Sequence, residues 1–486
     1  MSGNAGMRTD VRDRPVSYSP GRRTALVMCG TGAHGAYHAG VLRAIQEAGV
    51  KIDLVAGQGI GAGAAALAAI DGSVRLWEPN GLWRSRGAQN LYTWKPLLRA
   101  AGWIAVLLAG VLLVPLLVLA AGALVYAVGF LLTLLGLDAG AAVIASCSAW
   151  LQSAFAGDEL PLIVPRLAMV IVAALAIVAG GGTLVARWRR PIKRRSAGGW
   201  WWELAGAPFD ASGARAAFAD LVWQLIRGAA SARRPASTVV GRRYAEVLAE
   251  NVGQPGFREL LTLATDLDAR RDMVVALLRE PYRHDFLAPR PGRDRRAEVL
   301  DVAGIGRDHA VDIMAAALTP PVACEPALVA FSVDSFWRGE THRLCDRPAA
   351  IARLLEEVAA AGVAQVVIVT AVALSSQPHR LNPPRLDPRH RLGDFVVAAE
   401  AAALRDALET ARRDFTSIYL VSPTHNATGP FDFGGVYDEA SDRRQSLDEL
   451  VERGYEDAYR QFIEPIVGAS GEQLARSDTG ELRLGF

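Results

Sequence analysis

Two long uncharged runs interrupt an otherwise mixed pattern of hydrophobic and polar positions. Residues 100–137 and 167–186 carry no charged side chain and consist mainly of Leu, Val, Ala and Gly. About 20 apolar residues suffice to cross the ~30 Å hydrocarbon core of a bilayer. A surface helix of a water-soluble protein keeps a polar face, which these runs lack. We therefore predict transmembrane helices over about 103–135 and 167–187.

The charges around these runs predict their orientation. Arginine and lysine residues precede the first run and follow the second, whereas the segment between them carries three acids and one cation, Arg166. The positive-inside rule places both flanks in the cytoplasm of a multi-pass inner-membrane protein. Both flanks belong to one globular domain, so the number of crossings is even. Two crossings are the simplest arrangement, but residues 139–157 are also uncharged and leave four crossings or a re-entrant helix open.

Outside the membrane segments, short apolar strands alternate with amphipathic helices, which is typical of an α/β fold. Strands are predicted at 24–29, 54–56, 327–333 and 365–370, and helices at 34–48, 61–70 and 348–361. The expected organisation is a disordered tail over 1–23, the first part of the α/β domain over 24–83, a transmembrane insertion over 84–202, and the second part of the domain over 203–486.

Two glycine-rich turns come directly after the first two predicted strands, and each leads into a helix. Glycines permit a tight turn and let backbone N–H groups point at an anion from a helix N-terminus. A dinucleotide site is disfavoured, because residues 54–56 lack the acidic residue that such sites carry at the end of the second strand. The first turn comprises Gly30, Thr31, Gly32, Ala33, His34 and Gly35, and the second contains Gly57, Gly59 and Gly61.

This order of strand, glycine-rich turn, helix, strand and G-x-G-x-G turn resembles the patatin-like phospholipase family. The resemblance implies a three-layer α/β domain with a central, mainly parallel sheet, here interrupted by the transmembrane helical hairpin. It also implies a serine–aspartate dyad that hydrolyses an ester bond of a membrane lipid, with the oxyanion hole at the turn from Gly30 to Gly35. His34 stands where an arginine is usual in the family.

The nucleophile position departs from the family pattern G-x-S-x-G, because Gly59 stands where the serine belongs. A nucleophile elbow holds its central residue in a strained backbone conformation, which glycine adopts without a Cβ penalty. Gly59 therefore keeps the turn and removes the hydroxyl, and its neighbours Gln58 and Ile60 are not nucleophiles. We predict that the covalent route of acyl transfer is closed.

The family aspartate belongs to a turn that follows a strand and precedes a helix–strand unit. Asp334 matches that aspartate, because it begins the turn directly after the strand ALVAFSV and comes before a predicted helix and strand. The two small residues that follow the aspartate in the family are replaced by Ser335 and Phe336. The alternative is Asp432, in the sequence D-F-G-G, but only a C-terminal helix is predicted after it.

Composition excludes several classes of site. The formal net charge of +2 gives no case for nucleic-acid binding. The four cysteines show no C-x-x-C spacing and the eight histidines form no H-E-x-x-H pattern, so we expect no disulfide framework, no metal and no cofactor. Residues 1–23 lack an apolar core of signal-peptide length and are expected to remain as a cytoplasmic tail.

Three functions stay open. The leading hypothesis is a membrane-embedded, catalytically degenerate patatin-like protein that binds a membrane lipid or a fatty acyl chain in the bilayer. The second is an active lipid acyl hydrolase with an unrecognised nucleophile. The third is a membrane anchor whose globular domain recruits a protein partner or forms a homo-oligomer. Lipid binding separates the first hypothesis from the third, and turnover separates the second from both.

Overall fold

The computed structural model describes residues 18–189, 206–288, 295–335, 337–374, 387–424, 428–438 and 443–468. The chain divides into two compact units. Unit 1 comprises Met1–Thr93 and Phe209–Phe486, and unit 2 comprises Trp94–Pro208. Of the basic block that follows the second apolar run, Arg187 and Arg189 are described, and Arg190, Lys193, Arg194 and Arg195 lie outside the described residues.

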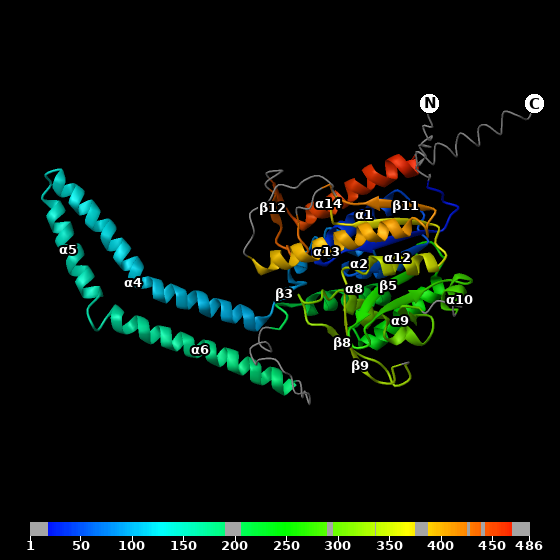
Figure 1. The fold of residues 1–486 in the computed structure, drawn as a ribbon, viewed down its shortest axis with the longest axis horizontal. Helices are drawn as coiled ribbons and strands as arrows, with labels where there is room; N and C mark the ends of the chain where they lie inside the picture. The colour runs from blue at the N-terminus through cyan, green and yellow to red at the C-terminus, as the bar shows by residue number, and fades with distance from the viewer. Residues whose placement is uncertain are drawn as a thin grey trace, which may run out of the picture. The chain divides into compact units, whose positions relative to one another are not determined.

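Unit 1 is built around a nine-stranded, mostly parallel sheet (Figure 1). Its main path runs β11-β10-β1-β2-β5-β6-β7, and all neighbours on this path are parallel except β5 and β6. The hairpin β8–β9 joins the sheet through antiparallel pairing of β9 with β5. The strands are β1 (Thr24–Cys29), β2 (Leu54–Gln58), β5 (Glu259–Asp266), β6 (Arg271–Leu277), β7 (Ala297–Asp301), β8 (Ala327–Ala330), β9 (Thr341–Cys345), β10 (Gln365–Thr370) and β11 (Ser417–Val421).

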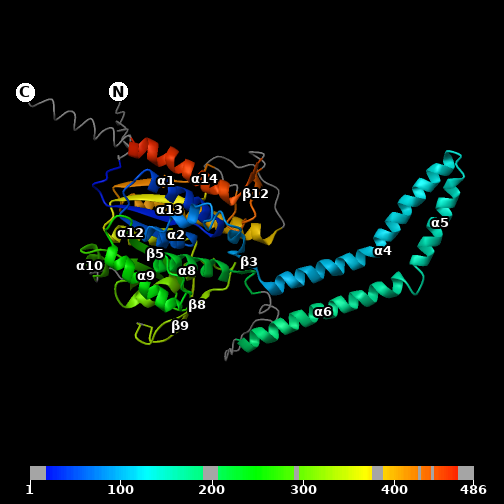
Figure 2. The same ribbon diagram turned by 180° about the vertical axis from the view of Figure 1, so that it is seen from behind.

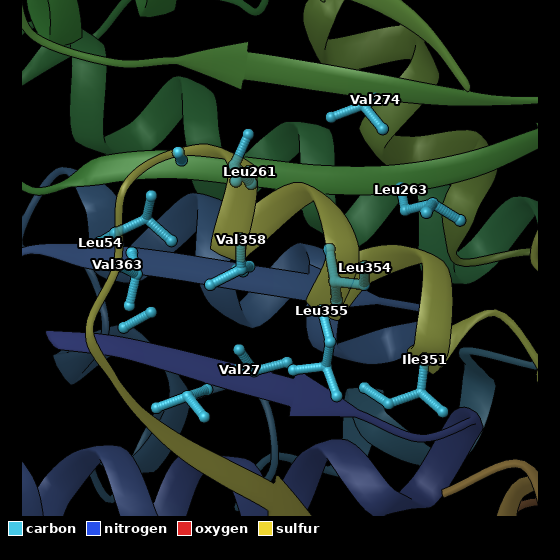
Figure 3. Close-up of a cluster of buried hydrophobic side chains, with 14 of the residues drawn as sticks. Val27, Leu54, Leu261, Leu263, Val274, Ile351, Leu354, Leu355, Val358 and Val363 are labelled. Atoms are coloured by element: carbon cyan, nitrogen blue, oxygen red, sulfur yellow. The ribbon is translucent and has the colours of Figure 1, made fainter. Parts of the chain in front are cut away.

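Helices cover both faces of this sheet, which gives the three-layer architecture (Figure 2). On one face, α12 (Ile351–Ala360) and α13 (Pro388–Ala411) pack on alternate residues of the strands. Figure 3 shows Leu354 and Val358 of α12 beside Val27 and Leu261 of the sheet. Burial of such apolar surface, at about 25 cal/mol per Å², supplies most of the favourable free energy of folding.

The opposite face carries α1 (Gly35–Glu47) and α2 (Ile60–Ala69), which follow the two glycine-rich turns. α14 (Leu447–Ala458) packs along α1. The other helices of unit 1 are α3 (Val74–Trp77), α8 (Ser212–Arg227), α9 (Ser237–Asn251), α10 (Tyr282–Leu287), α11 (Ala310–Ala317), the short helices η1 (Gly32–His34), η2 (Arg86–Asn90) and η3 (Ile305–Asp308), and the π-helix η4 (Tyr459–Gly468). Two small two-stranded sheets pair β12 (Val436–Asp438) with β13 (Arg443–Gln445), and β3 (Thr93–Trp94) with β4 (Phe209–Asp210).

Unit 2 consists of three helices, α4 (Pro96–Leu134), α5 (Ala139–Ala154) and α6 (Leu160–Arg189). Two helical segments, Pro96–Leu134 and Leu160–Gly181, are long and apolar enough to cross a membrane. Their most apolar windows are 0% and 6% buried inside the protein, unlike the core helices of a soluble protein. At about 1.5 Å per residue, the 39-residue α4 is nearly twice as long as the hydrocarbon core is thick.

Small residues let α5 approach α4 closely. A Cβ atom on Gly122 would lie 2.7 Å from the Leu151 side chain, and one on Gly140 would lie 2.4 Å from the Thr133 backbone nitrogen. The Cys147 thiol donates to the Gly122 carbonyl at 3.3 Å. Glycine at a helix crossing is typical of helix packing in membranes.

Unit 2 begins at Trp94 rather than at residue 84, and it ends at Pro208 rather than at 202. The reason is that the residues before β3 pack into unit 1. Trp83, Leu91 and Tyr92 are each 3% exposed or less, and the Leu91 carbonyl accepts a hydrogen bond from the Ala214 N–H of α8. The apolar pattern that predicted the insertion identifies the long apolar helices. It does not identify the residues before β3, which pack in unit 1.

Candidate active site

The turn between β2 and α2 has the geometry of a nucleophile elbow. Gly59 has φ 57° and ψ −134°, a conformation that L side chains rarely adopt. Small residues on either side make the turn possible, because a Cβ on Gly57 would lie 2.2 Å from the Gly61 carbonyl oxygen. A Cβ on Gly61 would lie 2.2 Å from the carbonyl oxygen of Met28 in β1.

The space beside Gly59 is filled by two oxygen atoms. A Cβ on Gly59 would lie 2.4 Å from the Gly30 carbonyl oxygen and 2.9 Å from Oδ2 of Asp346. The Gly30 oxygen accepts a hydrogen bond of 2.9 Å from the Ile60 N–H, the first N–H of α2. A serine at position 59 therefore requires the Gly30 carbonyl to move.

Two backbone N–H groups of the glycine-rich turn already donate hydrogen bonds to other groups of the protein. The Thr31 N–H donates to Nδ1 of His34 at 3.4 Å. The Ala33 N–H donates to the Pro430 carbonyl at 2.8 Å, and a Cβ on Gly32 would lie 2.0 Å from the same oxygen. An oxyanion hole needs donors aimed at an incoming oxygen, and these two donors are occupied.

Two buried carboxyl groups border the elbow. Asp346, directly after β9, is 2% exposed and accepts a hydrogen bond from the Gly59 N–H. Its burial, and next the negative charge of Glu400, raise the pKa of the Asp346 carboxyl well above its usual value. Glu400 of α13 is 7% exposed and accepts a 2.6 Å hydrogen bond from the Thr31 hydroxyl. Among the described residues, no hydrogen-bond partner reaches Oδ1 of Asp346 or Oε2 of Glu400.

Both histidines of this region are buried. His34 is 1% exposed, and its Nδ1 lies 3.6 Å from Oε2 of Glu400. The bond from the Thr31 N–H requires that Nδ1 be an acceptor, so the ring carries its proton on Nε2. His38 is fully buried with Nε2 3.1 Å from the Cys29 carbonyl, and burial lowers its pKa to about 3.

Neither aspartate considered in the sequence lies beside Gly59. Asp334 is exposed in the turn between β8 and β9. Asp432 organises the loop of residues 428–435, because its Oδ2 accepts from the Gly429 N–H at 3.0 Å and its Oδ1 lies 3.2 Å from Nδ1 of His390. The carboxyl group that the fold brings to Gly59 is Asp346, which replaces Asp334 as the candidate for the family aspartate.

Aromatic packing fixes the loop of residues 428–435, hereafter the Pro430 loop, over the turn. Phe433 stacks on Tyr92 with ring centroids 5.5 Å apart, and Phe431 packs on Phe209 at 5.3 Å. The Tyr92 hydroxyl donates to the Leu318 carbonyl at 2.6 Å. The carbonyl of Pro430 is thereby held against Ala33.

A small apolar cavity lies beside the elbow helix α2. It encloses about 30 Å³ and is lined by side chains from α2, α3 and α8, including Ala64, Leu67, Leu76 and Phe218. Small-molecule sites typically measure roughly 300–1,000 Å³. The cavity is therefore closed to a chain of several methylene groups. Within the described residues, no group of three or more His, Cys, Asp or Glu side chains is arranged to hold a metal ion.

Comparison with known proteins agrees with this strand–turn–helix geometry. Residues 26–170 match the model of the family described as Patatin-like phospholipase. Over these residues the chain is similar to a patatin-like phospholipase domain. The turn at Gly30, the elbow at Gly59 and the mostly parallel sheet belong to this patatin-like fold.

Curated relatives share a short segment with the patatin-like chain. Neuropathy target esterase sws from Drosophila persimilis, Drosophila grimshawi and Drosophila willistoni are each 55% identical over 49 residues. That segment is 10% of this chain and 3% of each relative, so the chain matches only a small part of those proteins. The crystal structure of VipD from Legionella pneumophila aligns with 92% of this chain and 67% of its own, at 12% identity and a TM-score of 0.29. A similarity at that level carries no argument about function.

Proposed function

We propose that this chain is a catalytically silent, membrane-embedded patatin-like protein that binds a membrane lipid or fatty acyl chain. The proposal rests on one observation above all: the Gly30 carbonyl oxygen lies 2.4 Å from the position that a Cβ on residue 59 would take, and it accepts the hydrogen bond of the Ile60 N–H. A covalent acyl-enzyme needs an activated oxygen at that point, and Gly59 supplies none.

The donors of the turn support the same conclusion. Thr31 and Ala33 direct their N–H groups to His34 and Pro430, so a developing oxyanion would have to displace two internal hydrogen bonds. Each such bond contributes about 1 kcal/mol net, and a lost oxyanion donor costs roughly 100-fold or more in rate. Contact with lipid is supported by the apolar segments Pro96–Leu134 and Leu160–Gly181, whose most apolar windows are 0% and 6% buried. The small cavity along α2 would have to widen to admit an acyl chain.

An active lipid acyl hydrolase is the alternative, and Asp346 favours it. Its carboxyl group lies where the aspartate of a serine–aspartate dyad would serve a residue at position 59. At this site the hydroxyl that is hydrogen-bonded to a carboxylate, as a nucleophile would be, is that of Thr31. However, Thr31 is 1% exposed and its hydroxyl donates to Glu400. Binding of a protein partner remains the third hypothesis.

The first prediction is that the detergent-purified protein hydrolyses neither a short fluorogenic ester nor a phospholipid, and does not react with a serine-directed fluorophosphonate. The same preparation should be labelled by a photoreactive fatty acid, with the adduct mapped by mass spectrometry to the helices that line the cavity. A serine esterase run in the same detergent verifies the assays.

Asp346→Asn and Asp334→Asn form the matched pair for this experiment. Turnover by the parent that Asp346→Asn abolishes and Asp334→Asn preserves would establish the active hydrolase instead. Absence of both turnover and labelling by the fatty acid would leave the anchor hypothesis in place of lipid binding.

We further propose that α4 and α6 cross the inner membrane once each, with unit 1 in the cytoplasm. Lys95 and Arg99 precede the apolar part of α4, whereas Asp138 and the pair Asp158 and Glu159 lie in the two turns between the helices. The continuity of α4 over 39 residues supports one crossing rather than two within that helix.

The second prediction concerns this topology. The four native cysteines are buried, so single cysteines placed at exposed Gln89, Asp138 and Asp158 can report accessibility. In intact cells, a membrane-impermeant maleimide should label Asp138→Cys and Asp158→Cys but not Gln89→Cys until the cells are broken. Labelling of Asp158→Cys without Asp138→Cys indicates four crossings, and labelling of Gln89→Cys in intact cells indicates the opposite orientation.

A further inference from the structure

The orientation of one peptide group decides whether the space beside Gly59 is free or is filled by the Gly30 carbonyl oxygen. The second arrangement, which the structure has, is the blocked orientation. The plane between Gly30 and Thr31 directs its C=O toward Gly59 and Ile60 and its N–H toward His34. Because this plane is rigid, turning it over would exchange the two groups. The Gly30 oxygen would leave the elbow, the Ile60 N–H would be freed, and the Thr31 N–H would point to the place that the oxygen had occupied.

The backbone dihedrals show which residue opposes that rotation. Turning the plane over changes ψ of Gly30 and φ of Thr31 by about 180° each. Gly30, at φ 150°, has no Cβ to restrict it. The φ of Thr31 would move from −117° to about +63°, a region in which a β-branched residue is an outlier.

We propose that Thr31 holds the glycine-rich turn in its blocked orientation, so that restoring the serine at position 59 does not by itself restore a working site. The proposal rests on the proposed function, since it explains why the oxyanion turn is silent. Two further contacts hold the blocked orientation. The Thr31 hydroxyl is bonded to Glu400, and the imidazole of His34, unlike an arginine side chain, can accept the Thr31 N–H.

The test compares four full-length variants: Gly59→Ser, Thr31→Gly, the double variant Thr31→Gly/Gly59→Ser, and Thr31→Val/Gly59→Ser. Valine keeps the β-branched side chain and removes the hydroxyl, so it separates the backbone restriction from the bond to Glu400. Labelling by a fluorophosphonate, quantified by intact-protein mass spectrometry, reports a reactive serine without knowledge of the substrate.

We expect the double variant with glycine at position 31 to be labelled at least about ten-fold faster than Gly59→Ser, the factor that corresponds to a left-handed backbone penalty. The variant with valine should react as slowly as Gly59→Ser. Equal labelling of Gly59→Ser and the Thr31→Gly double variant would overturn the proposal, and so would silence of all the serine-containing variants when they are folded.

Thermal unfolding of the same proteins gives a second readout that does not depend on reactivity. Thr31→Gly should lower the melting temperature of the parent, because glycine loses more conformational entropy. In the Gly59→Ser background, Thr31→Gly should raise the melting temperature, because the glycine lets the Gly30 carbonyl move away from the new serine side chain. The same sign of change in both backgrounds, or a double variant that folds no better than Gly59→Ser, contradicts the proposal. Turnover by the parent would instead refute the silent site itself.

Discussion

Alanine in place of Gly40 should destabilise unit 1 by about 3 kcal/mol, although alanine is the better helix former by about 1 kcal/mol. Gly40 lies where α1 crosses α14, and a Cβ there would lie 1.9 Å from the Val451 carbonyl oxygen and 2.8 Å from the Tyr455 nitrogen. These are backbone atoms inside a helix, so no side-chain rotation can relieve the clash. Gly454 makes the reciprocal approach, because a Cβ there would lie 2.2 Å from the Tyr37 carbonyl oxygen.

The effect should be visible as a lower midpoint in denaturant unfolding of the protein in detergent. Gly110→Ala is the matched control, because Gly110 is also helical and a Cβ there would meet nothing within 4 Å. The control should unfold like the parent. If Gly40→Ala were as stable as the parent, the close packing of α14 on α1 would be wrong, and with it the support of the turn that precedes α1.

The fold was predictable from local pattern, whereas the site was predictable only in part. The apolar strand before Gly30 and the small-residue helix after Gly59 carry their periodicity in a few neighbouring residues, and both lie as expected. The strand THRLC of β9 was missed, because His342 and Arg343 make it resemble a polar loop. Its alternation of buried His342 and Leu344 with exposed Thr341 and Arg343 was the signal that would have revealed it.

Because β9 was not predicted, the sequence pattern favoured the aspartate that precedes β9 over the one that directly follows it. Asp334 lies in the turn after the first strand of that hairpin, and Asp346 directly follows the second strand, so the order of elements alone favoured the aspartate that does not lie beside Gly59. The contacts of Pro430 with Gly32 and Ala33 join residues about 400 positions apart. No local pattern encodes such a contact, because it depends on how the Pro430 loop packs on Tyr92 and Phe209.

The departures from the family motifs are mutually consistent. Gly59 leaves room for the Gly30 carbonyl, Thr31 holds that carbonyl in place, and His34 accepts the N–H that points the other way. Loss of the serine alone would not require His34 in place of the family arginine. Together with the contacts of Thr31, these two departures favour a turn that is stabilised in its blocked orientation, and hence a binding role rather than hydrolysis.

Asp346→Asn should make the protein more stable at pH 7 to 8, because the asparagine cannot ionise in this buried position. Burial raises the pKa of the Asp346 carboxyl well above the unperturbed 3.8, so the folded protein binds a proton that the unfolded chain releases. The stability that this group contributes is fully present below about pH 3.8 and is lost as the pH rises toward its folded pKa. An asparagine keeps an oxygen for the Gly59 N–H and cannot ionise.

Unfolding free energies of the parent and Asp346→Asn, measured in denaturant from pH 5 to pH 8, should therefore diverge as the pH rises. Glu400 and Arg347 face the same carboxyl group, so Glu400→Gln should reduce the pH dependence of the parent without abolishing it. Asp334→Asn, at an exposed turn, should leave that dependence unchanged. If Asp346→Asn were the less stable protein at pH 8, the Asp346 carboxylate would be stabilised in its charged form. That result is expected of a dyad aspartate kept ready for catalysis, and it would favour the active hydrolase over the silent site.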